Sequence, residues 1–316
     1  MGHRLGIDIG ATKTKLILLD PKGKMLAKEQ ILTDSIGSVE PIAARAGAKL
    51  EELLARHRLK RSQLEGCGIG VAGQQDPETG VIDDSPNLKW FGVQFKKPME
   101  KALKLRIRMA NDVNAAGWGE YVYGSKRKCP NLAVIFVGSG IGGGFVINGK
   151  LVEGACGAAA EVGHAIFRED GIRCDCRRLG CHEAYAGGHP LEKRMRKLAR
   201  QGKSPMIVKM VKGDLAKINT RTIADAAKKG DPVAKKLWSD ATLSLCVLSA
   251  NLVSLLNPNR LVLGGGVIEG NPSLLPAIRK FVNQRAVALS AQRCEIIVSQ
   301  LKGDAIALGA AALVEV

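Results

Sequence analysis

The sequence has few aromatic residues, few cysteines and no long hydrophobic run. Phe, Tyr and Trp make up 4% of the 316 residues, and the eight cysteines are too sparse for a disulfide scaffold. The N-terminus has no apolar run of signal-peptide length, because Asp8 interrupts it. The longest apolar stretches, at 252–256 and 305–314, fall far short of the roughly 20 residues of a membrane span. These absences predict a cytoplasmic protein with no membrane partner.

Acidic residues are scarce relative to basic ones. The chain has 30 Asp and Glu against 47 Lys and Arg, a formal net charge of +17. Most of the surplus lies in residues 171–236, which hold 17 Lys and Arg against six Asp and Glu. A basic surface attracts polyanions, but this stretch lacks interleaved aromatic residues and any recognisable nucleic-acid-binding module. We therefore expect no specific nucleic-acid partner, and interpret the stretch as a solvated surface or one that steers anionic substrates.

Two segments share a plan of strand, glycine turn and strand. The first covers residues 5–19 and the second covers residues 132–147. Two similar hairpins about 130 residues apart predict two related halves of α/β structure. Helical apolar spacing at 41–58 and 233–256 supports this interpretation. Further strands are predicted at 66–72, 106–110, 260–263 and 295–299. Strands that alternate with helices predict sheets covered on both faces.

The glycine turns are candidate phosphate-binding elements. The second hairpin matches G-x-G-x-x-G, but a strand follows it, whereas a dinucleotide-binding fingerprint opens a helix. Glycine lets backbone N–H groups approach a phosphate chain closely, and a third glycine run follows an apolar strand at 261–263. Asp8 is a candidate for Mg²⁺, held through water. The predicted phosphate- or ATP-binding residues are Asp8, Gly10, Thr12, Lys13, Gly138, Ser139, Gly140, Gly264, Gly265 and Gly266.

Three cysteines lie close together at Cys174, Cys176 and Cys181. Three thiols in a short cytosolic segment are typical of a metal site, and Zn²⁺ needs a fourth ligand to complete a tetrahedron. His164 and His182 are both candidates for that ligand. The spacing therefore predicts structural zinc rather than free thiols or a disulfide.

The motifs together resemble the ROK family of repressors, open reading frames and kinases, and its glucokinases in particular. Residues 8–13 resemble the first phosphate motif of actin-like sugar kinases, and residues 138–144 resemble the second. The resemblance extends to residues 301–305 and the Ala-rich segment after them. It implies an α/β, actin-like (ribonuclease H-like) fold of two domains with a cleft between them. The implied domains are 1–112 plus 300–316, which is smaller, and 113–299, which carries the zinc loop.

A carboxylate follows the predicted strand at 106–110. In the string Asn111-Asp112-Val113-Asn114, Asp112 is placed to point into a ligand-binding crevice, and it is also a plausible helix N-cap. The string is similar to the family's catalytic motif, which implies that Asp112 is the general base that accepts the proton of the sugar hydroxyl.

The resemblance also implies a sugar site and a zinc site. The implied sugar-binding residues are Gly73, Asn87, Asn111, Asp112, Glu161, His164 and Glu183. The implied zinc ligands are His164, Cys174, Cys176 and Cys181, so His164 serves both sites. The sequence departs from the family twice: Gln74-Gln75 replaces the more usual Pro-Val, and Arg177 replaces a glycine. If that glycine was needed for a positive φ, the local turn is expected to differ.

The implied activity is ATP-dependent phosphorylation of a hexose, glucose at its 6-hydroxyl by default, with Mg²⁺ and structural Zn²⁺. The alternatives are a polyphosphate-dependent glucokinase or glucomannokinase, and kinases of N-acetylhexosamines, fructose, mannose or allose. A sugar-sensing repressor is a further alternative, disfavoured because the first hairpin begins at Leu5 and leaves no room upstream for a helix-turn-helix domain. A homodimer is expected from the family.

Overall fold

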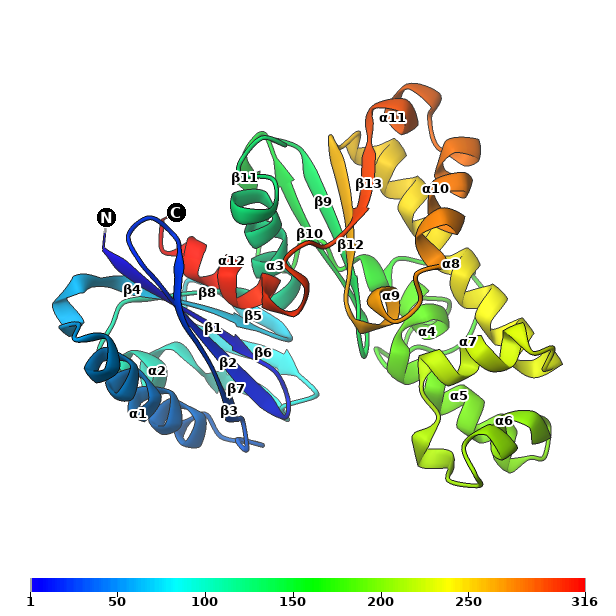
Figure 1. Ribbon diagram of the computed structural model, residues 1–316, viewed down its shortest axis with the longest axis horizontal. Helices are drawn as coiled ribbons and strands as arrows, with labels where there is room; N and C mark the ends of the chain where they lie inside the picture. The colour runs from blue at the N-terminus through cyan, green and yellow to red at the C-terminus, as the bar shows by residue number, and fades with distance from the viewer. Residues whose placement is uncertain (1, 316) are drawn as a thin grey trace. The chain divides into compact units, whose positions relative to one another are not determined.

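The computed structural model describes residues 2–315 and divides into two compact units (Figure 1). Unit 1 comprises Met1–Pro130, Gly144–Ala160 and Gln300–Val316, and unit 2 comprises Asn131–Gly143 and Glu161–Ser299. The predicted domain boundary after residue 112 therefore falls inside unit 1. The reason is local packing: Gly119 in α3 (Asp112–Gly119) lies so close to Gly309 in α12 (Ala305–Leu313) that an added Cβ would meet its backbone.

Unit 1 is built on a five-stranded sheet. Its order is β3-β2-β1-β4-β8, with β1 antiparallel to β2 and parallel to β4, and with β4 parallel to β8. The strands are β1 (His3–Ile9), β2 (Lys13–Leu19), β3 (Met25–Leu32), β4 (Leu64–Val71) and β8 (Ile107–Asn111). A small antiparallel sheet contains β5 (Gln74–Asp76), β6 (Val81–Ser85) and β7 (Trp90–Gln94).

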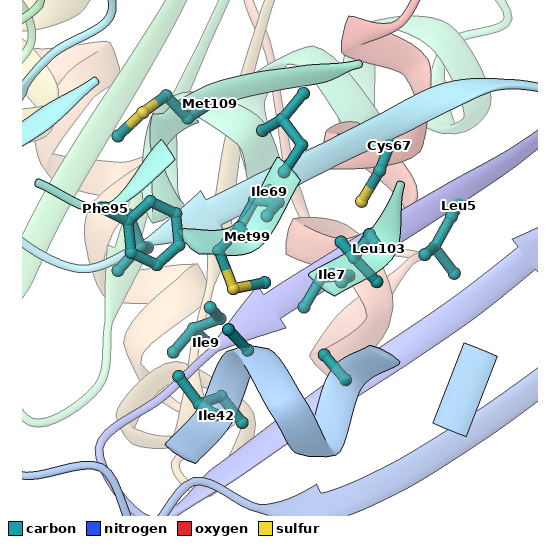
Figure 2. Packing of buried hydrophobic residues seen from close by; sticks show 14 of the residues in the cluster. Leu5, Ile7, Ile9, Ile42, Cys67, Ile69, Phe95, Met99, Leu103 and Met109 are labelled. Atoms are coloured by element: carbon teal, nitrogen blue, oxygen red, sulfur yellow. The ribbon is translucent and has the colours of Figure 1, made fainter. Parts of the chain in front are cut away.

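The two faces of the unit 1 sheet differ because large and small residues alternate along its strands. Leu5, Ile7 and Ile9 on β1 are buried against α1 (Glu40–His57) and α2 (Lys96–Leu103), as Figure 2 shows. Each such side chain contributes about 1.5–3 kcal/mol when fully buried. On the opposite face, a Cβ at Gly6 would overlap a backbone oxygen of α12, and a Cβ at Gly68 would do the same. These glycines let the Ala-rich α12 lie directly on the sheet.

A second sheet has β9, β12, β13 and the start of β10 in unit 2, whereas the rest of β10 and β11 belong to unit 1. The second five-stranded sheet has the order β11-β10-β9-β12-β13, and the division between the units falls within β10. β9 and β12 are parallel, as are β12 and β13. The strands are β9 (Leu132–Val137), β10 (Ile141–Ile147), β11 (Lys150–Leu151), β12 (Arg260–Gly264) and β13 (Glu295–Val298). The helices of unit 2 are α4 (His182–Ala186), α5 (Gly188–Arg200), α6 (Pro205–Met210), α7 (Thr220–Lys228), α8 (Pro232–Leu256), α9 (Gly266–Glu269), α10 (Leu274–Arg285) and α11 (Ala288–Arg293).

α8 confirms the helix predicted at 233–256. It is 25 residues long and, by length and composition alone, apolar enough to cross a membrane. Half of its most apolar window is buried, and its Ser244 hydroxyl lies 2.9 Å from Nδ1 of His182 on α4. It packs against α4, α7 and α10. These contacts are those of a core helix, and its composition is weak evidence for membrane insertion.

Candidate functional site

The first glycine hairpin joins β1 to β2. The N–H of Gly10 donates to the carbonyl of Lys13 at 3.1 Å, and the side chains of Thr12 and Lys13 are exposed at the tip. Asp8 lies one residue before the end of β1. Its pKa is raised to about 7 because it is buried and because the charge of Asp112 is nearby, while Lys15 acts in the opposite direction. The hairpin thus presents backbone and side-chain donors beside a carboxylate with an elevated pKa.

Asn111 and Asp112 share the junction between β8 and α3. Asn111, not Asp112, is the N-cap: its Oδ1 accepts from the N–H groups of Val113 at 2.9 Å and Asn114 at 3.3 Å. The N-cap interpretation of Asp112 is therefore wrong. Asp112 is the first helical residue, and its Oδ1 accepts from Val113 N–H at 2.9 Å. Burial raises the pKa of Asp112, and that backbone hydrogen bond offsets part of the rise.

Asn111 also connects the helix to the loop at Gly73. Its Nδ2 donates to the Gly73 carbonyl at 3.2 Å, so two residues predicted to bind sugar lie together in unit 1. Gly73 has φ +123°, and a Cβ there would overlap the Asp84 carbonyl, so only glycine fits. Asn87 is exposed in the turn between β6 and β7.

The second hairpin, in unit 2, lies at the carboxyl end of β9. The N–H of Gly138 donates to the Gly140 carbonyl at 3.0 Å. The first residues of α5 bind the same turn, because Gly188 N–H donates to the Gly138 carbonyl at 3.0 Å and His189 N–H donates to the Ser139 carbonyl at 2.8 Å. The start of α5 is therefore fixed to the predicted phosphate-binding turn.

The third glycine run, Gly264 to Gly266, follows β12, the parallel neighbour of β9. Gly265 has φ +87°, and a Cβ on it would lie 2.5 Å from the Val137 carbonyl oxygen, so glycine is required by its backbone and by its neighbour. The second hairpin and the third glycine run thus leave adjacent strand ends in unit 2, which is where α/β sheets commonly bind ligands.

Gly138 and Gly266 differ from Gly265 in a way that bears on ligand binding. Neither has a positive φ, and apart from its neighbours in the chain a Cβ on either would have no atom of the described residues within 4 Å. Their lack of a side chain is therefore explained neither by conformation nor by packing within the chain. Open space beside two backbone segments fits a ligand that approaches the main chain closely, as nucleotide phosphates do.

Glu183 binds the second hairpin directly. Its Oε2 accepts from the N–H of Ile141 at 2.8 Å, and its Oε1 lies 3.9 Å from Sγ of Cys174. Glu161 precedes the turn that carries His164, and its carbonyl accepts from His164 N–H at 3.0 Å. Glu161, His164 and Glu183 all belong to unit 2, whereas Asn111 and Asp112 belong to unit 1.

The cysteine segment gathers four side chains with metal-ligating atoms. The ligating atoms of His164, Cys174, Cys176 and Cys181 all lie within 4.8 Å of one another. Sγ of Cys176 is 3.6 Å from Sγ of Cys181, and Sγ of Cys174 is 3.9 Å from Nδ1 of His164. Such spacings fit four ligands around one Zn²⁺, since Zn–S distances near 2.3 Å place thiolates about 3.7 Å apart.

His182 is not part of this group. Its Nδ1 pairs with the Ser244 hydroxyl, and burial lowers its pKa to about 4. Of the two histidines that the sequence offered, the geometry therefore selects His164, which leaves Nε2 of that ring available for another partner.

Comparison with known proteins identifies the family. The model of the ROK family matches residues 4–316. This chain belongs to the ROK family. The glucokinase of Streptomyces coelicolor is 31% identical over 322 residues, which cover 99% of this chain and 98% of that protein. The xylose repressor of Caldicellulosiruptor bescii is 29% identical over 314 residues, which cover 99% of this chain and 78% of the repressor.

Solved ROK structures confirm the predicted fold class. A ROK glucokinase from Streptomyces griseus, in complex with glucose and AMPPNP, has a TM-score of 0.79 and 31% identity, and the match covers 99% of both chains. The ROK hexokinase from Thermus thermophilus has a TM-score of 0.80 and 27% identity, with 98% of this chain and 96% of that chain covered. This ROK protein has the α/β fold of the actin-like sugar kinases.

One departure of this ROK chain has an outcome opposite to the expectation. Arg177 adopts φ +71°, the left-handed region that glycine favours, so this position has a positive φ without glycine. The N–H of Arg177 donates to the Cys174 carbonyl at 2.9 Å, and Cys174 N–H donates to the Arg178 carbonyl at 2.8 Å. These bonds hold a non-glycine residue in a conformation that costs about 1–2 kcal/mol.

Two features of the site were missed from the sequence. The hydrogen bond between Glu183 and Ile141 of the second hairpin joins residues 42 positions apart, and no local sequence pattern predicts it. The attachment of α5 to Gly138 and Ser139 also depends on tertiary packing. The glycine pair at 187–188 was the available signal, because a Cβ on Gly188 would lie 2.5 Å from the Gly138 carbonyl oxygen.

Proposed function

We propose that this ROK protein is a sugar kinase that transfers the γ-phosphoryl group of ATP to a hexose, by default to the 6-hydroxyl of glucose. The observation that carries the proposal is Asp112, a half-buried carboxylate at the first residue of α3 whose pKa is raised by desolvation. Such a group is a stronger proton acceptor than an ordinary aspartate, as the attack of a sugar hydroxyl requires. Kinases and repressors both occur among the relatives, and a general base is what a kinase needs.

In the proposed reaction, Asp112 accepts the proton of the attacking hydroxyl. The hydroxyl oxygen forms a bond to the γ-phosphorus, the bond to the bridging oxygen of the β-phosphate breaks, and ADP leaves. Asn111 holds the first turn of α3 and the Gly73 loop, which fixes the direction of the neighbouring carboxylate. Precise positioning of this kind accounts for much of the catalysis in phosphoryl transfer.

The nucleotide is assigned to the glycine turns. Gly138 and Gly266 leave room for its approach, and the exposed tip of the first hairpin supplies Thr12 and Lys13 for phosphate oxygens. Asp8 would hold Mg²⁺ through water, and that ion supplies charge neutralisation at the phosphates. Glu183 keeps the second hairpin in place through Ile141.

The sugar is assigned to Gly73, Asn87, Asn111, Glu161, His164 and Glu183. Buried hydroxyl groups need fixed partners, and missing partners are costly, so these polar groups would set which hexose is accepted. His164 would bind Zn²⁺ through Nδ1 and a sugar hydroxyl through Nε2, so that the metal site orients the ring. We also infer a homodimer and a cytoplasmic location, as for the family.

The test of substrate is an ADP-release assay over glucose, mannose, fructose, allose, N-acetylglucosamine and N-acetylmannosamine. Turnover with glucose well above that with the other sugars supports the proposal. Turnover highest with another hexose would correct the sugar while keeping the kinase. No ADP release with any sugar, combined with tight sugar binding, would instead support a sugar-sensing regulator.

A second donor is favoured by a row of basic side chains on α5, in which Lys193 pairs with Asp175 at 3.1 Å. Its exposed residues His189, Lys193, Lys197 and Arg200 are spaced by four, four and three positions and therefore share one face. The row begins where α5 binds Ser139 and continues for about 17 Å. A linear polyphosphate chain that enters the second hairpin would follow this row.

The polyphosphate version is tested with glucose and polyphosphate in the absence of nucleotide. We expect Lys197→Gln combined with Arg200→Gln to raise the KM for long polyphosphate about tenfold and to leave the KM for ATP unchanged. Lys228→Gln, an exposed lysine at the end of α7, is the matched control. No turnover with polyphosphate would reject this donor and leave the ATP-dependent reaction standing.

A further inference from the structure

A cavity in unit 1 lies apart from every residue assigned to the sugar, nucleotide or zinc. Its volume is about 320 Å³, within the range of small-molecule sites. Part of its wall is apolar, from Met109, Leu151 and Leu313. The charged residues on its wall are Arg108, Lys150 and Glu153. Trp118 on α3 also lines it.

The polar groups of the cavity wall have unmet bonding capacity. The indole Nε1 of Trp118 is buried and has no hydrogen-bond partner among the described residues, and the side chain is only 4% exposed. Because that nitrogen has almost no accessible surface, a ligand in the cavity meets the indole ring and not its N–H, which serves as a reporter of changes at the wall. Among the described residues, Arg108 and Lys150 have no carboxylate in ion-pair contact.

The ring of Trp118 is held in place by two neighbouring side chains. It lies 5.2 Å from the Tyr121 ring, and the Arg127 guanidinium lies 5.6 Å above it. Arg127 in turn pairs with Glu315 at 2.5 Å. The ring is therefore fixed by contacts that do not depend on a ligand, which preorganises the cavity wall.

We propose that this cavity binds a small organic anion: a carboxylate or phosphate ester on an apolar body. Arg108 and Lys150 would bind the anionic group, and the body would contact Trp118, Met109, Leu151 and Leu313. Two cations against the single carboxylate of Glu153 favour a net negative ligand.

The cavity shares two elements, β8 and α3, with the proposed base Asp112. Arg108 and Met109 precede Asp112 on β8, and Trp118 follows it on α3, so the wall is built from the two elements that meet at Asn111 and Asp112. An occupant that contacts both elements would bias the direction of Asp112. This regulatory step rests on the proposed function, whereas binding of the anion does not.

Binding is tested with three probes that share a phenyl ring: phenyl phosphate, phenylacetate and the neutral benzyl alcohol. The readout is the Nε1–H resonance of Trp118 in a ¹⁵N-labelled chain, assigned among the three tryptophans by its loss in Trp118→Phe. We expect at least one anion to shift this resonance with a Kd below about 5 mM, and benzyl alcohol to bind at least about tenfold more weakly.

Arg108→Gln should weaken binding of the anion about tenfold and leave basal turnover unchanged. Arg106→Gln, which replaces an exposed arginine outside the cavity, should change neither the affinity nor the turnover.

An anion-dependent change in turnover that disappears in Arg108→Gln supports the regulatory step, and no change in turnover overturns that step. Binding is overturned if neither anion moves the resonance, if benzyl alcohol binds as tightly as the anions, or if Arg108→Gln binds like the unmodified protein. Because the resonance is read without catalysis, these results do not depend on whether the protein is a kinase.

Discussion

At the scale of single residues, Asn111 and Asp112 divide two tasks that either one could have performed. Asn111 uses Oδ1 to cap α3 and Nδ2 to bind the Gly73 carbonyl. Asp112 therefore does not cap the helix, and its Oδ1 accepts from the N–H of Val113. Burial raises the pKa of the carboxyl, so its proton affinity exceeds that of a solvated aspartate. Because the amide of Asn111 caps the helix, the carboxylate of Asp112 is available to accept a proton.

Asp8 gives a pH-dependent prediction. Its pKa is raised to about 7, and Mg²⁺ requires the ionised carboxylate. The group is mostly protonated below that value, so metal affinity should fall as the pH drops and be fully present above it. We expect the Mg²⁺ concentration for half-maximal turnover to rise several-fold from about pH 8 to about pH 6. A Mg²⁺ requirement that is constant over this range would contradict the assignment.

Arg177 gives a stability prediction. Because it adopts φ +71°, Arg177→Gly should relieve strain and raise the free energy of unfolding by about 1 kcal/mol. The matched control is Arg178→Gly, since Arg178 is not among the residues with positive φ. Denaturant unfolding of the zinc-loaded protein compares the two. Equal destabilisation by both substitutions would show that the Arg177 conformation carries no cost.

At the scale of elements, the glycine turns separate residues needed for folding from residues needed for a ligand. A Cβ at Gly265 conflicts with both its φ and Val137, whereas a Cβ at Gly138 or Gly266 enters open space. We expect Gly138→Ala and Gly266→Ala to change the free energy of unfolding by less than about 0.5 kcal/mol while raising the KM for ATP about tenfold.

The control for this prediction is Gly265→Ala, which should destabilise the fold by more than about 1 kcal/mol. Unfolding curves and ATP titrations on the three variants provide the measurement. Unchanged ATP kinetics in both Gly138→Ala and Gly266→Ala would remove these turns from the nucleotide site.

The zinc loop is held by more than its proposed metal. Arg168 lies over the rings of Phe167 and Tyr185 and pairs with Asp240 on α8 at 2.9 Å. Metal analysis of the purified protein should find about one zinc per chain. Because the Arg168 contacts do not involve the metal, removing zinc should raise the KM for sugar through His164 and have less effect on the free energy of unfolding of unit 2. Well under one zinc per chain, with three freely reactive thiols, would contradict the site.

At the scale of the whole molecule, the sequence predicted hairpins and helices, which depend on local residue patterns, but did not predict how these elements pack. The two hairpins were predicted from glycine between apolar runs, and they are confirmed as β1–β2 and β9–β10. The helical spacing at 41–58 and 233–256 is confirmed by α1 and α8. These features depend on residues close in sequence, where periodicity and turn chemistry carry the information.

Features that depend on tertiary contacts were not predicted from the sequence. The close approach of α3 and α12, which Gly119 and Gly309 permit across 190 positions, has no signal in the local sequence. Asp112 was considered as the N-cap of α3, but the neighbouring Asn111 caps the helix, and Asn and Asp cap equally well. The positive φ at Arg177 was not predicted, because arginine rarely adopts a positive φ. Each miss involves a partner distant in sequence or a conformation unusual for its residue type.

The central claim, a kinase whose base is Asp112, is tested most directly by the turnover of Asp112→Asn with ATP and the preferred hexose. The substitution keeps size and hydrogen-bonding capacity but removes the proton acceptor. We predict unchanged sugar affinity and thermal stability with a kcat reduced about 10²- to 10⁴-fold. A variant that is folded, binds sugar and retains a near-normal kcat would contradict the account.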